Sequence, residues 1–293
     1  FTGANDTGVQ LCRRGYPTEV LFAGKPLDTD KSVVIDTESR TIDSETAYRV
    51  VKDSLKLVDF LGFGHVIKKI DSTMRGNIAE EVKAVDEVYK PELIIFAPAY
   101  PDMGRTTVGG IQRLKGQEIC KTELSKDPKN PVTEDRLNGL LSKAYTEPII
   151  LKGLADVRDV GLSFEGGRIF ACDAETNDDL HRIIRAAKRE RKRTLYIGSA
   201  GIADSLMETE NPADPAFAVV ASVSSVTNEQ MHRCEREGYT LVKIPVHDIL
   251  LGRKAAASYR DEAIAALKRG EDTILLTNTA YDRKELDTSI EAG

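Results

Sequence analysis

The sequence has only four cysteines in 293 residues, and no two of them form a CxxC pair. Neighbouring cysteines lie more than 50 residues apart, at Cys12, Cys120, Cys172 and Cys234. Zinc sites and dithiol redox sites usually need closely spaced pairs, so this spacing supports neither. Reduced thiols are the simpler interpretation, and we expect a cytoplasmic protein.

The sequence also has no excess of basic residues. The chain has 41 Lys and Arg against 47 Asp and Glu, which gives a net charge of -6 and a pI near 5.5. This balance does not attract phosphate backbones or anionic lipids, so we expect neither nucleic acid nor a membrane as a partner. No apolar run approaches the ~18 residues that span a bilayer, and the first residues do not have the pattern of a signal peptide.

Several common enzyme signatures are missing from the sequence. There is no GxxxxGK[ST] phosphate loop, no GxGxxG dinucleotide fingerprint, no HExxH zinc motif and no GxSxG hydrolase motif. The four histidines share no spacing, which gives little support to a mechanism based on histidine.

What is present is the composition of a folded globular protein, with 41% hydrophobic and 30% charged residues. The length suits two domains of ordinary size. Short apolar runs alternate with helical patterns, which is typical of βαβ units. Expected strands lie at 19–22, 32–35, 93–96, 148–151, 168–171 and 194–197, and expected helices at 44–61, 77–88 and 178–193. We therefore predict an α/β fold with largely parallel sheets.

Turn formers and acidic residues at 208–215 interrupt this alternation and have the composition of an exposed linker. We predict an amino-terminal domain over 1–207, a carboxyl-terminal domain over 216–293, and a cleft between them. The chain opens in a glycine-bearing turn without a methionine, and its second domain has about three strands where five or six are usual, so we expect the natural protein to extend at both ends. In the second domain we expect strands at 216–221, 240–244 and 273–277 and helices at 228–237 and 259–268.

Cationic, acidic and hydroxyl side chains crowd into residues 68–77, just before an expected helix. Arginine grips a carboxylate with two parallel hydrogen bonds, lysine supplies a point charge, and aspartate and serine can fix sugar hydroxyls. The segment suits a small, anionic, hydroxylated molecule, although a solvated loop that caps the next helix has the same composition.

Two further polar loops, 36–40 and 97–110, follow expected strands. Open parallel sheets bind ligands beyond the carboxyl ends of their strands. Arg40, Arg75 and Arg105 could therefore converge on one anion, and three scattered surface arginines are the alternative.

Small and hydroxyl-bearing residues mark four more turns, at 1–8, 173–176, 198–201 and 221–227. Such turns can bring backbone amides close to an anion, or they can simply cap helices. The residues alone do not decide between the two interpretations.

Seven of these segments, in this order, resemble the four-carbon acid sugar kinases. They are FTGANDTG at 1–8, DTESR at 36–40, KKIDSTMRGN at 68–77, APAYP at 97–101 with GRTTVGG at 104–110, DAET at 173–176, GSAG at 198–201, and SVS at 222–224 with VT at 226–227. The resemblance covers about 225 residues and is specific in its order.

The resemblance implies an ATP-dependent sugar acid kinase, a phosphotransferase with an alcohol group as acceptor. It would phosphorylate the terminal 4-hydroxyl of a four-carbon acid such as D-threonate, D-erythronate or 3-oxo-tetronate. The amino-terminal domain would hold the acid and the carboxyl-terminal domain would hold ATP with Mg²⁺. Phosphoryl transfer depends mainly on alignment and charge neutralisation, which cationic loops provide.

The resemblance also implies roles for individual residues. It assigns acid-sugar contacts to Arg40, Lys69, Asp71, Ser72 and Thr73, with Arg75 and Arg105 as additions, and an ATP contact to Ser224 or its neighbour Ser222. In relatives an aspartate pair precedes the opening motif and glycine-rich segments follow later, so we expect a nearly complete acid site here and part of a nucleotide site. No residue is assigned as the general base, and no metal ligand is predicted.

Two alternatives come from other classes of protein. A non-catalytic sugar-acid-binding or regulatory module could hold the same ligand between two lobes, and turnover of Mg-ATP would separate it from a kinase. A sugar-acid dehydrogenase fits less well, because the dinucleotide fingerprint is missing. The stereoisomer of the acid and the oligomeric state stay open.

Overall fold

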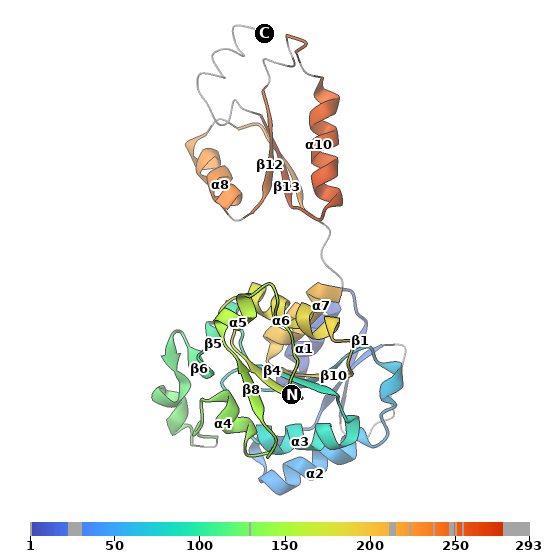
Figure 1. The fold of residues 1–293 in the computed structure, drawn as a ribbon, viewed down its shortest axis with the longest axis vertical. Coiled ribbons are helices and arrows are strands. Elements are labelled where there is room, and N and C mark those ends of the chain that lie inside the picture. The colour runs from blue at the N-terminus through green and yellow to red at the C-terminus, as the bar shows by residue number, and fades with distance from the viewer. Residues whose placement is uncertain are drawn as a thin grey trace. The chain divides into compact units, whose positions relative to one another are not determined.

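A computed structural model describes residues 2–22, 31–128, 130–210, 215–222, 224–236, 238–245, 249, 251–253 and 255–277. The chain divides into two compact units, Phe1–Pro212 and Ala213–Gly293. Each unit contains a parallel sheet with helices, which confirms the predicted α/β class (Figure 1). Residues 208–210 lie in helix α7 (Ala200–Glu210) and not in the expected linker, and residues 211–214 lie outside the described ranges.

A five-stranded parallel sheet forms the centre of the first unit, in the order β3-β10-β4-β9-β8. A separate parallel pair, β1-β2, belongs to the same unit. The bounds are β1 Thr18–Phe22, β2 Ser32–Asp36, β3 Val66–Lys69, β4 Leu93–Ala97, β8 Ile149–Lys152, β9 Ile169–Cys172 and β10 Thr194–Gly198. All six strands predicted for this unit are confirmed, and their first and last residues differ from the predicted ones by at most one position. The sequence analysis missed β3 because half of its VIKK sequence is cationic.

Helices cover both faces of this sheet. Figure 1 shows α2 and α3 together on one side and α1, α6 and α7 on the other. The side chains of β4 alternate accordingly, with Leu93, Ile95 and Ala97 in one core and Ile94 and Phe96 in the other. The bounds are α1 Thr2–Arg13, α2 Ser44–Leu55, α3 Ile78–Tyr89, α4 Leu137–Leu141, α5 Leu154–Arg158 and α6 Asn177–Arg189.

Three segments differ from their predicted structure, and the smallest difference is that helix α6 ends at Arg189 instead of 193. Residues 2–8 begin helix α1 and do not form a turn, because Leu11 is buried in the core and Gly8 lets the helix approach β1, where an added Cβ would lie 3.1 Å from Val20. Helix α2 ends at Leu55 instead of 61, since the Asp59 side chain accepts a hydrogen bond from the Leu61 amide and starts a separate turn.

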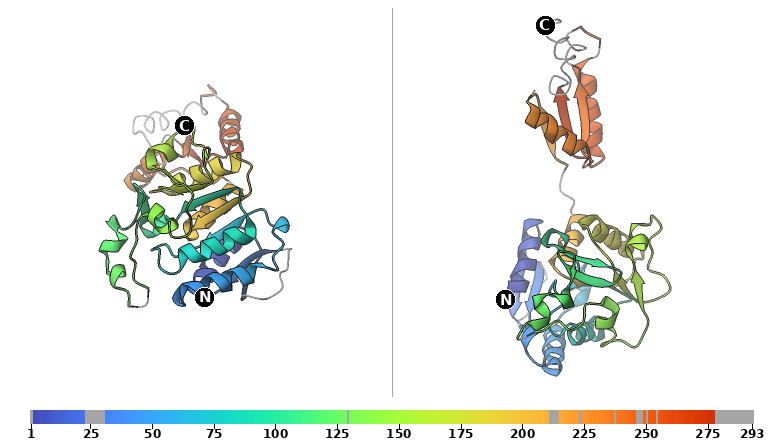
Figure 2. Two further views of the ribbon diagram at one scale, coloured as in Figure 1. Left: turned by 60° about the horizontal axis from the view of Figure 1, so that its bottom comes forward. Right: turned by 90° about the vertical axis from the view of Figure 1, so that its left-hand side faces the viewer.

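A small antiparallel sheet, β5-β6-β7, extends from the first unit (Figure 2). Gly109 and Gly110 join β5 to β6 with positive φ at both positions, as tight hairpins require. Their amides donate to the buried carboxylate of Asp173, at 2.6 and 2.8 Å, which anchors the hairpin to the end of β9. The bounds are β5 Arg105–Val108, β6 Ile111–Leu114 and β7 Gln117–Glu118, and short 3-10 turns occupy Ser39–Thr41, Phe60–Gly62, Pro101–Met103, Ile119–Lys121 and Glu123–Lys126.

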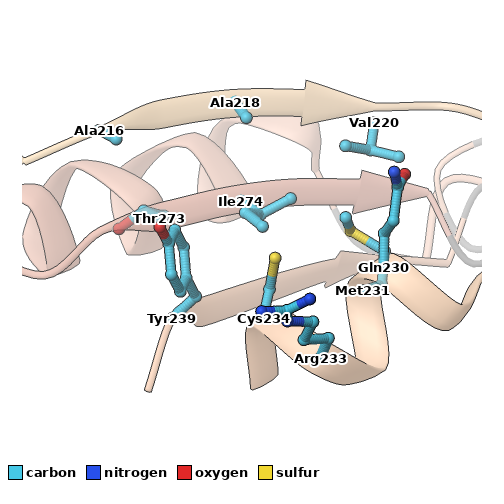
Figure 3. A pocket seen from close by; sticks show the side chains of 10 residues that line it. All are labelled: Ala216, Ala218, Val220, Gln230, Met231, Arg233, Cys234, Tyr239, Thr273 and Ile274. Carbon is cyan, nitrogen blue, oxygen red and sulfur yellow. The ribbon is translucent and has the colours of Figure 1, made fainter. Parts of the chain in front are cut away.

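The second unit has three parallel strands in the order β11-β13-β12. Its five expected elements are confirmed as β11 Phe217–Val220, α8 Ser225–Arg236, β12 Thr240–Ile244, α10 Ala256–Lys268 and β13 Thr273–Thr277. A cavity of about 410 Å³ lies between α8 and the sheet, and Figure 3 shows Met231, Cys234 and Ile274 lining it. Across the described ranges, no helix combines the length and apolar character that a membrane span requires.

Candidate functional site

The carboxyl ends of β3, β10 and β4 meet at one edge of the sheet, because these strands are parallel neighbours. The loops that follow them enclose a cavity of about 210 Å³. Its lining consists of Gly3, Arg40, Lys69, Asp71, Ser72, Arg75, Tyr100, Ser199 and Ala200. This is the edge at which open parallel sheets bind ligands.

A second cavity of about 350 Å³ adjoins the first one and extends toward the end of β2. The two cavities share the three cationic side chains Arg40, Lys69 and Arg75, together with Gly3 and Asp71. A single polar groove, which we call the strand-end site, therefore contains five of the seven predicted acid-sugar contacts: Arg40, Lys69, Asp71, Ser72 and Arg75.

Asp71 is the acidic centre of the strand-end site, and its side chain is only 13% exposed. Its carboxylate accepts hydrogen bonds from Arg75 Nε at 2.8 Å and from Thr73 Oγ1 at 2.5 Å, and Arg40 Nη2 lies 3.9 Å away. Burial by itself raises the pKa of Asp71, but the Arg75 and Thr73 hydrogen bonds and the nearby positive charges outweigh burial and lower it. Asp71 is therefore an ionised hydrogen-bond acceptor at neutral pH.

Arg75 and Arg40 differ in how closely other side chains already bind their guanidinium groups. Arg75 contacts both oxygens of Asp71 and also Asp127, at 3.4 Å, and these hydrogen bonds raise its pKa. Arg40 lies at a longer distance from Asp71, and 44% of its side chain is exposed. Arg40 is therefore better placed to bind an incoming anion with its planar fork.

The first turn of helix α1 closes one side of the site. A Cβ added at Gly3 would lie 3.2 Å from Lys69 Nζ and 3.9 Å from Arg40 Nη2. The lack of a side chain at Gly3 therefore leaves room for the Lys69 ammonium beside the helix.

Gly76 sets the position of Arg40. Its φ is +96°, a value that other residues rarely adopt, and an added Cβ would lie 2.9 Å from Arg40 Cγ. The loop that follows β3 can therefore lie close against the loop that carries Arg40 only because residue 76 is glycine.

Two predicted contacts lie outside the lining of the strand-end site. Thr73 is buried and acts on Asp71 through its hydroxyl. Arg105 is the first residue of β5, where its guanidinium donates to the Met103 carbonyl and its backbone pairs with Tyr100. The structure thus brings Arg40 and Arg75 to one groove and does not bring Arg105 there.

The sequence analysis singled out some segments without choosing the residues that line the groove. Gly3, Tyr100, Ser199 and Ala200 all belong to motifs quoted above, but their small or neutral side chains gave no signal of their own. Ser199 is buried, and its hydroxyl donates to the Ala99 carbonyl at 2.9 Å. This bond ties the loop after β10 to the loop after β4.

Ser222 and Ser224 lie in the second unit, at the start of helix α8. The Thr227 amide donates to Ser224 Oγ at 3.1 Å, and the Thr227 hydroxyl lies 3.1 Å from Ser222 Oγ. Three exposed hydroxyls thus gather at a helix amino end, an arrangement that can hold a phosphate group. Within the described ranges, no cluster of three or more His, Cys, Asp or Glu side chains is arranged to hold a metal ion.

The fold and the strand-end site define a two-unit α/β protein with a polar groove at the carboxyl edge of a parallel sheet. Residues 1–206 match the model of a family described as the sugar-binding N-terminal domain. A D-threonate kinase of Salmonella typhimurium is 34% identical over a match that covers 99% of this chain and 73% of that protein. The chain belongs to the four-carbon acid sugar kinase family, which confirms the resemblance found in its sequence.

Other relatives carry related names. A D-erythronate kinase of Heliobacterium modesticaldum is 29% identical over 85% of this chain, and a D-threonate kinase of Bordetella bronchiseptica is 27% identical over 81%. The chain spans 62% and 61% of the lengths of these two proteins.

Solved structures share the fold. A domain of unknown function from Bordetella bronchiseptica, with bound citrate and described as a domain-swapped dimer, has a TM-score of 0.64 at 24% identity, covering 94% of this chain and 72% of that one. A Haemophilus influenzae protein has a TM-score of 0.62 at 20% identity, covering 100% and 78%. At these identities the likeness shows the fold alone.

Proposed function

We propose that this chain belongs to an ATP-dependent kinase that phosphorylates the terminal hydroxyl of a four-carbon sugar acid, such as D-threonate, D-erythronate or 3-oxo-tetronate. The observation that carries the proposal is the strand-end site, where Arg40 and Lys69 lie beside an ionised Asp71. The names of the curated relatives support the substrate class.

The cations of the site suit the carboxylate of such an acid. Arg40 offers a planar pair of donors, and Lys69 offers a point charge. The cavity bounded by these groups has a volume of about 210 Å³.

Asp71 and Ser72 suit the hydroxyl groups of the acid. An ionised carboxylate accepts hydrogen bonds, so Asp71 would orient a substrate hydroxyl rather than donate to it. The lowered pKa makes Asp71 a weak base, and its role in the proposal is orientation. Phosphoryl transfer gains most from such alignment of acceptor and donor.

The second unit would supply part of the ATP site. The hydroxyls of Ser222, Ser224 and Thr227 at the amino end of α8 fit a phosphate group. Mg²⁺ is commonly held by substrate phosphates and only one or two carboxylates, so we propose that it arrives as Mg-ATP. The described residues provide no metal cage of their own.

Release of ADP from Mg-ATP tests the proposal. The natural full-length protein would be assayed with D- and L-threonate, D- and L-erythronate and 3-oxo-tetronate. We expect turnover with at least one acid. Binding of an acid without ADP release from any of them would instead indicate a non-catalytic sugar-acid-binding module.

A further inference from the structure

Arg40 and Lys69 come from elements that do not pair with each other. Arg40 follows β2, which is hydrogen-bonded to β1, whereas Lys69 ends β3, which is hydrogen-bonded to β10. In the described part of the chain, β2 and β3 belong to different sheets. Backbone pairing between these strands therefore does not fix the distance between the two cations, and another group must do so.

Glu81 provides such a link. It lies on α3 beneath the groove and is only 7% exposed. One carboxylate oxygen, Oε1, accepts from Ser39 Oγ at 2.7 Å, and the other, Oε2, lies 2.6 Å from Lys68 Nζ. Ser39 immediately precedes Arg40, and Lys68 immediately precedes Lys69. One buried carboxylate thus holds the neighbours of both cations.

The contacts around Glu81 strengthen this link. Lys68 also donates to the Lys69 carbonyl at 3.0 Å, so its ammonium fixes the end of β3. Asn77, at the start of α3, donates to the Ser39 carbonyl at 2.9 Å. The charge of Glu81 also neutralises Lys68, whose side chain is only 14% exposed.

We propose that Glu81 is a positioning residue that sets the placement of Arg40 relative to Lys69, and thereby the affinity of the strand-end site for the carboxylate of the sugar acid. This inference rests on the proposed function. Glu81 lines the larger cavity of the groove, but Ser39 and Lys68 already engage both of its carboxylate oxygens, and Glu81 would act through these two residues. The hydrogen bonds involve a buried charged group, which makes them strong and sensitive to geometry.

Two variants test the role of Glu81. Glu81→Leu keeps the approximate size of the side chain but has no acceptor oxygen, so it can hold neither Ser39 nor Lys68. Ser39→Ala removes the Ser39–Glu81 bond, together with the contact between the Ser39 and Thr37 hydroxyls, and keeps the Lys68–Glu81 pair, which protects folding. With D-threonate as the probe in titration calorimetry, we expect each variant to bind about tenfold more weakly, while the Kd for ATP stays the same.

A double-mutant cycle separates positioning from a general structural effect. If Ser39 acts through Arg40, Ser39→Ala should change the Kd for D-threonate less than twofold in an Arg40→Ala background. A tenfold loss in both backgrounds would overturn the inference, as would no loss in the parent background. Ser142→Ala, which removes an exposed hydroxyl bonded to the Asn138 carbonyl, is the matched control and should bind D-threonate normally.

The parent protein separates this inference from the proposed function. If it binds none of the five acids named above, the proposed function and the inference fail together. If it binds D-threonate and the Ser39 and Glu81 variants bind equally well, only the positioning role of Glu81 is overturned.

Discussion

Arg40 is the side chain on which the proposed recognition of a carboxylate depends most. It is more exposed than Arg75 and lies farther from Asp71. We expect Arg40→Ala to weaken binding of D-threonate by about 10- to 100-fold, the range for a hydrogen bond to a charged group, and to leave the Kd for ATP unchanged. Titration calorimetry with each ligand measures both effects.

Arg49→Ala is the control for Arg40→Ala. Arg49 lies on the exposed side of α2, where its guanidinium donates to Thr46 Oγ1. Arg49→Ala removes the same charge as Arg40→Ala, but Arg49 does not line the groove. Equal losses of D-threonate affinity in the two variants would mean that only the overall charge matters, and would remove Arg40 from the site.

Gly76 gives a second prediction at the scale of a single residue. Gly76→Ala should lower the free energy of unfolding by about 1–2 kcal/mol, because alanine is strained at positive φ, and should also weaken D-threonate binding by displacing Arg40. Gly116→Ala shares the positive φ, but its Cβ would meet no atom within 4 Å. For Gly116→Ala, we expect a similar loss of unfolding free energy, measured in urea. We expect its binding of D-threonate to be unchanged. Normal binding by Gly76→Ala would contradict the account.

The sequence predicts the loops of the site better than it predicts the individual contacts. Loops after parallel strands of one sheet gather at one edge, and this places Asp71 with Tyr100 and Ser199. The order of the strands does not predict where a side chain points, so it did not predict that Arg105 points back to the Met103 carbonyl. Glu81 gave no signal, because an acidic residue in the first turns of a helix is commonly exposed.

At the scale of single elements, the start of helix α6 is held by one buried carboxylate. Asp179 accepts from the Glu175 and Thr176 amides, at 3.0 and 3.1 Å, and Arg158 binds it through two nitrogens at 2.9 Å. Burial raises the pKa of Asp179, but the Arg158 and backbone hydrogen bonds outweigh burial and lower the pKa to about 2.

The lowered pKa of Asp179 predicts how stability depends on pH. An unfolded aspartate has a pKa of about 3.9, so the stabilisation by Asp179 is fully present above that pH and is lost as the pH falls toward about 2. Asp179→Asn should lose about 2 kcal/mol of unfolding free energy at pH 7 and about half as much at pH 3. Urea unfolding of both proteins at the two pH values measures the difference. A difference that does not change with pH would contradict the assignment.

Most elements could be predicted because their apolar runs are buried on both sides, as in β4, where all five residues are buried. Elements that carry function were harder to predict. Strand β3 ends in Lys68 and Lys69, which line the groove, and the small residues at the start of α1 have the composition of a turn. In both cases, residues that line the groove weaken the hydrophobic pattern from which the strand or helix could be predicted.

At the scale of the whole molecule, the chain consists of two α/β units with different polar sites. The first unit contains the strand-end site, and the second contains the hydroxyl cluster at the start of α8. The turn formers near residue 210 led us to predict a domain boundary with a linker from residue 208, whereas helix α7 continues to Glu210. Helix α7 could not be foreseen because its glycine and polar residues resemble a loop.

The central claim is that the strand-end site binds a small acid through its carboxylate. Titration calorimetry of the protein with D-threonate and with threitol, the polyol that has an alcohol in place of the carboxylate, tests this claim most directly. The account predicts measurable binding of D-threonate and at least about tenfold weaker binding of threitol, because Arg40 and Lys69 would lose their anionic partner. Equal affinity for the two molecules would contradict it.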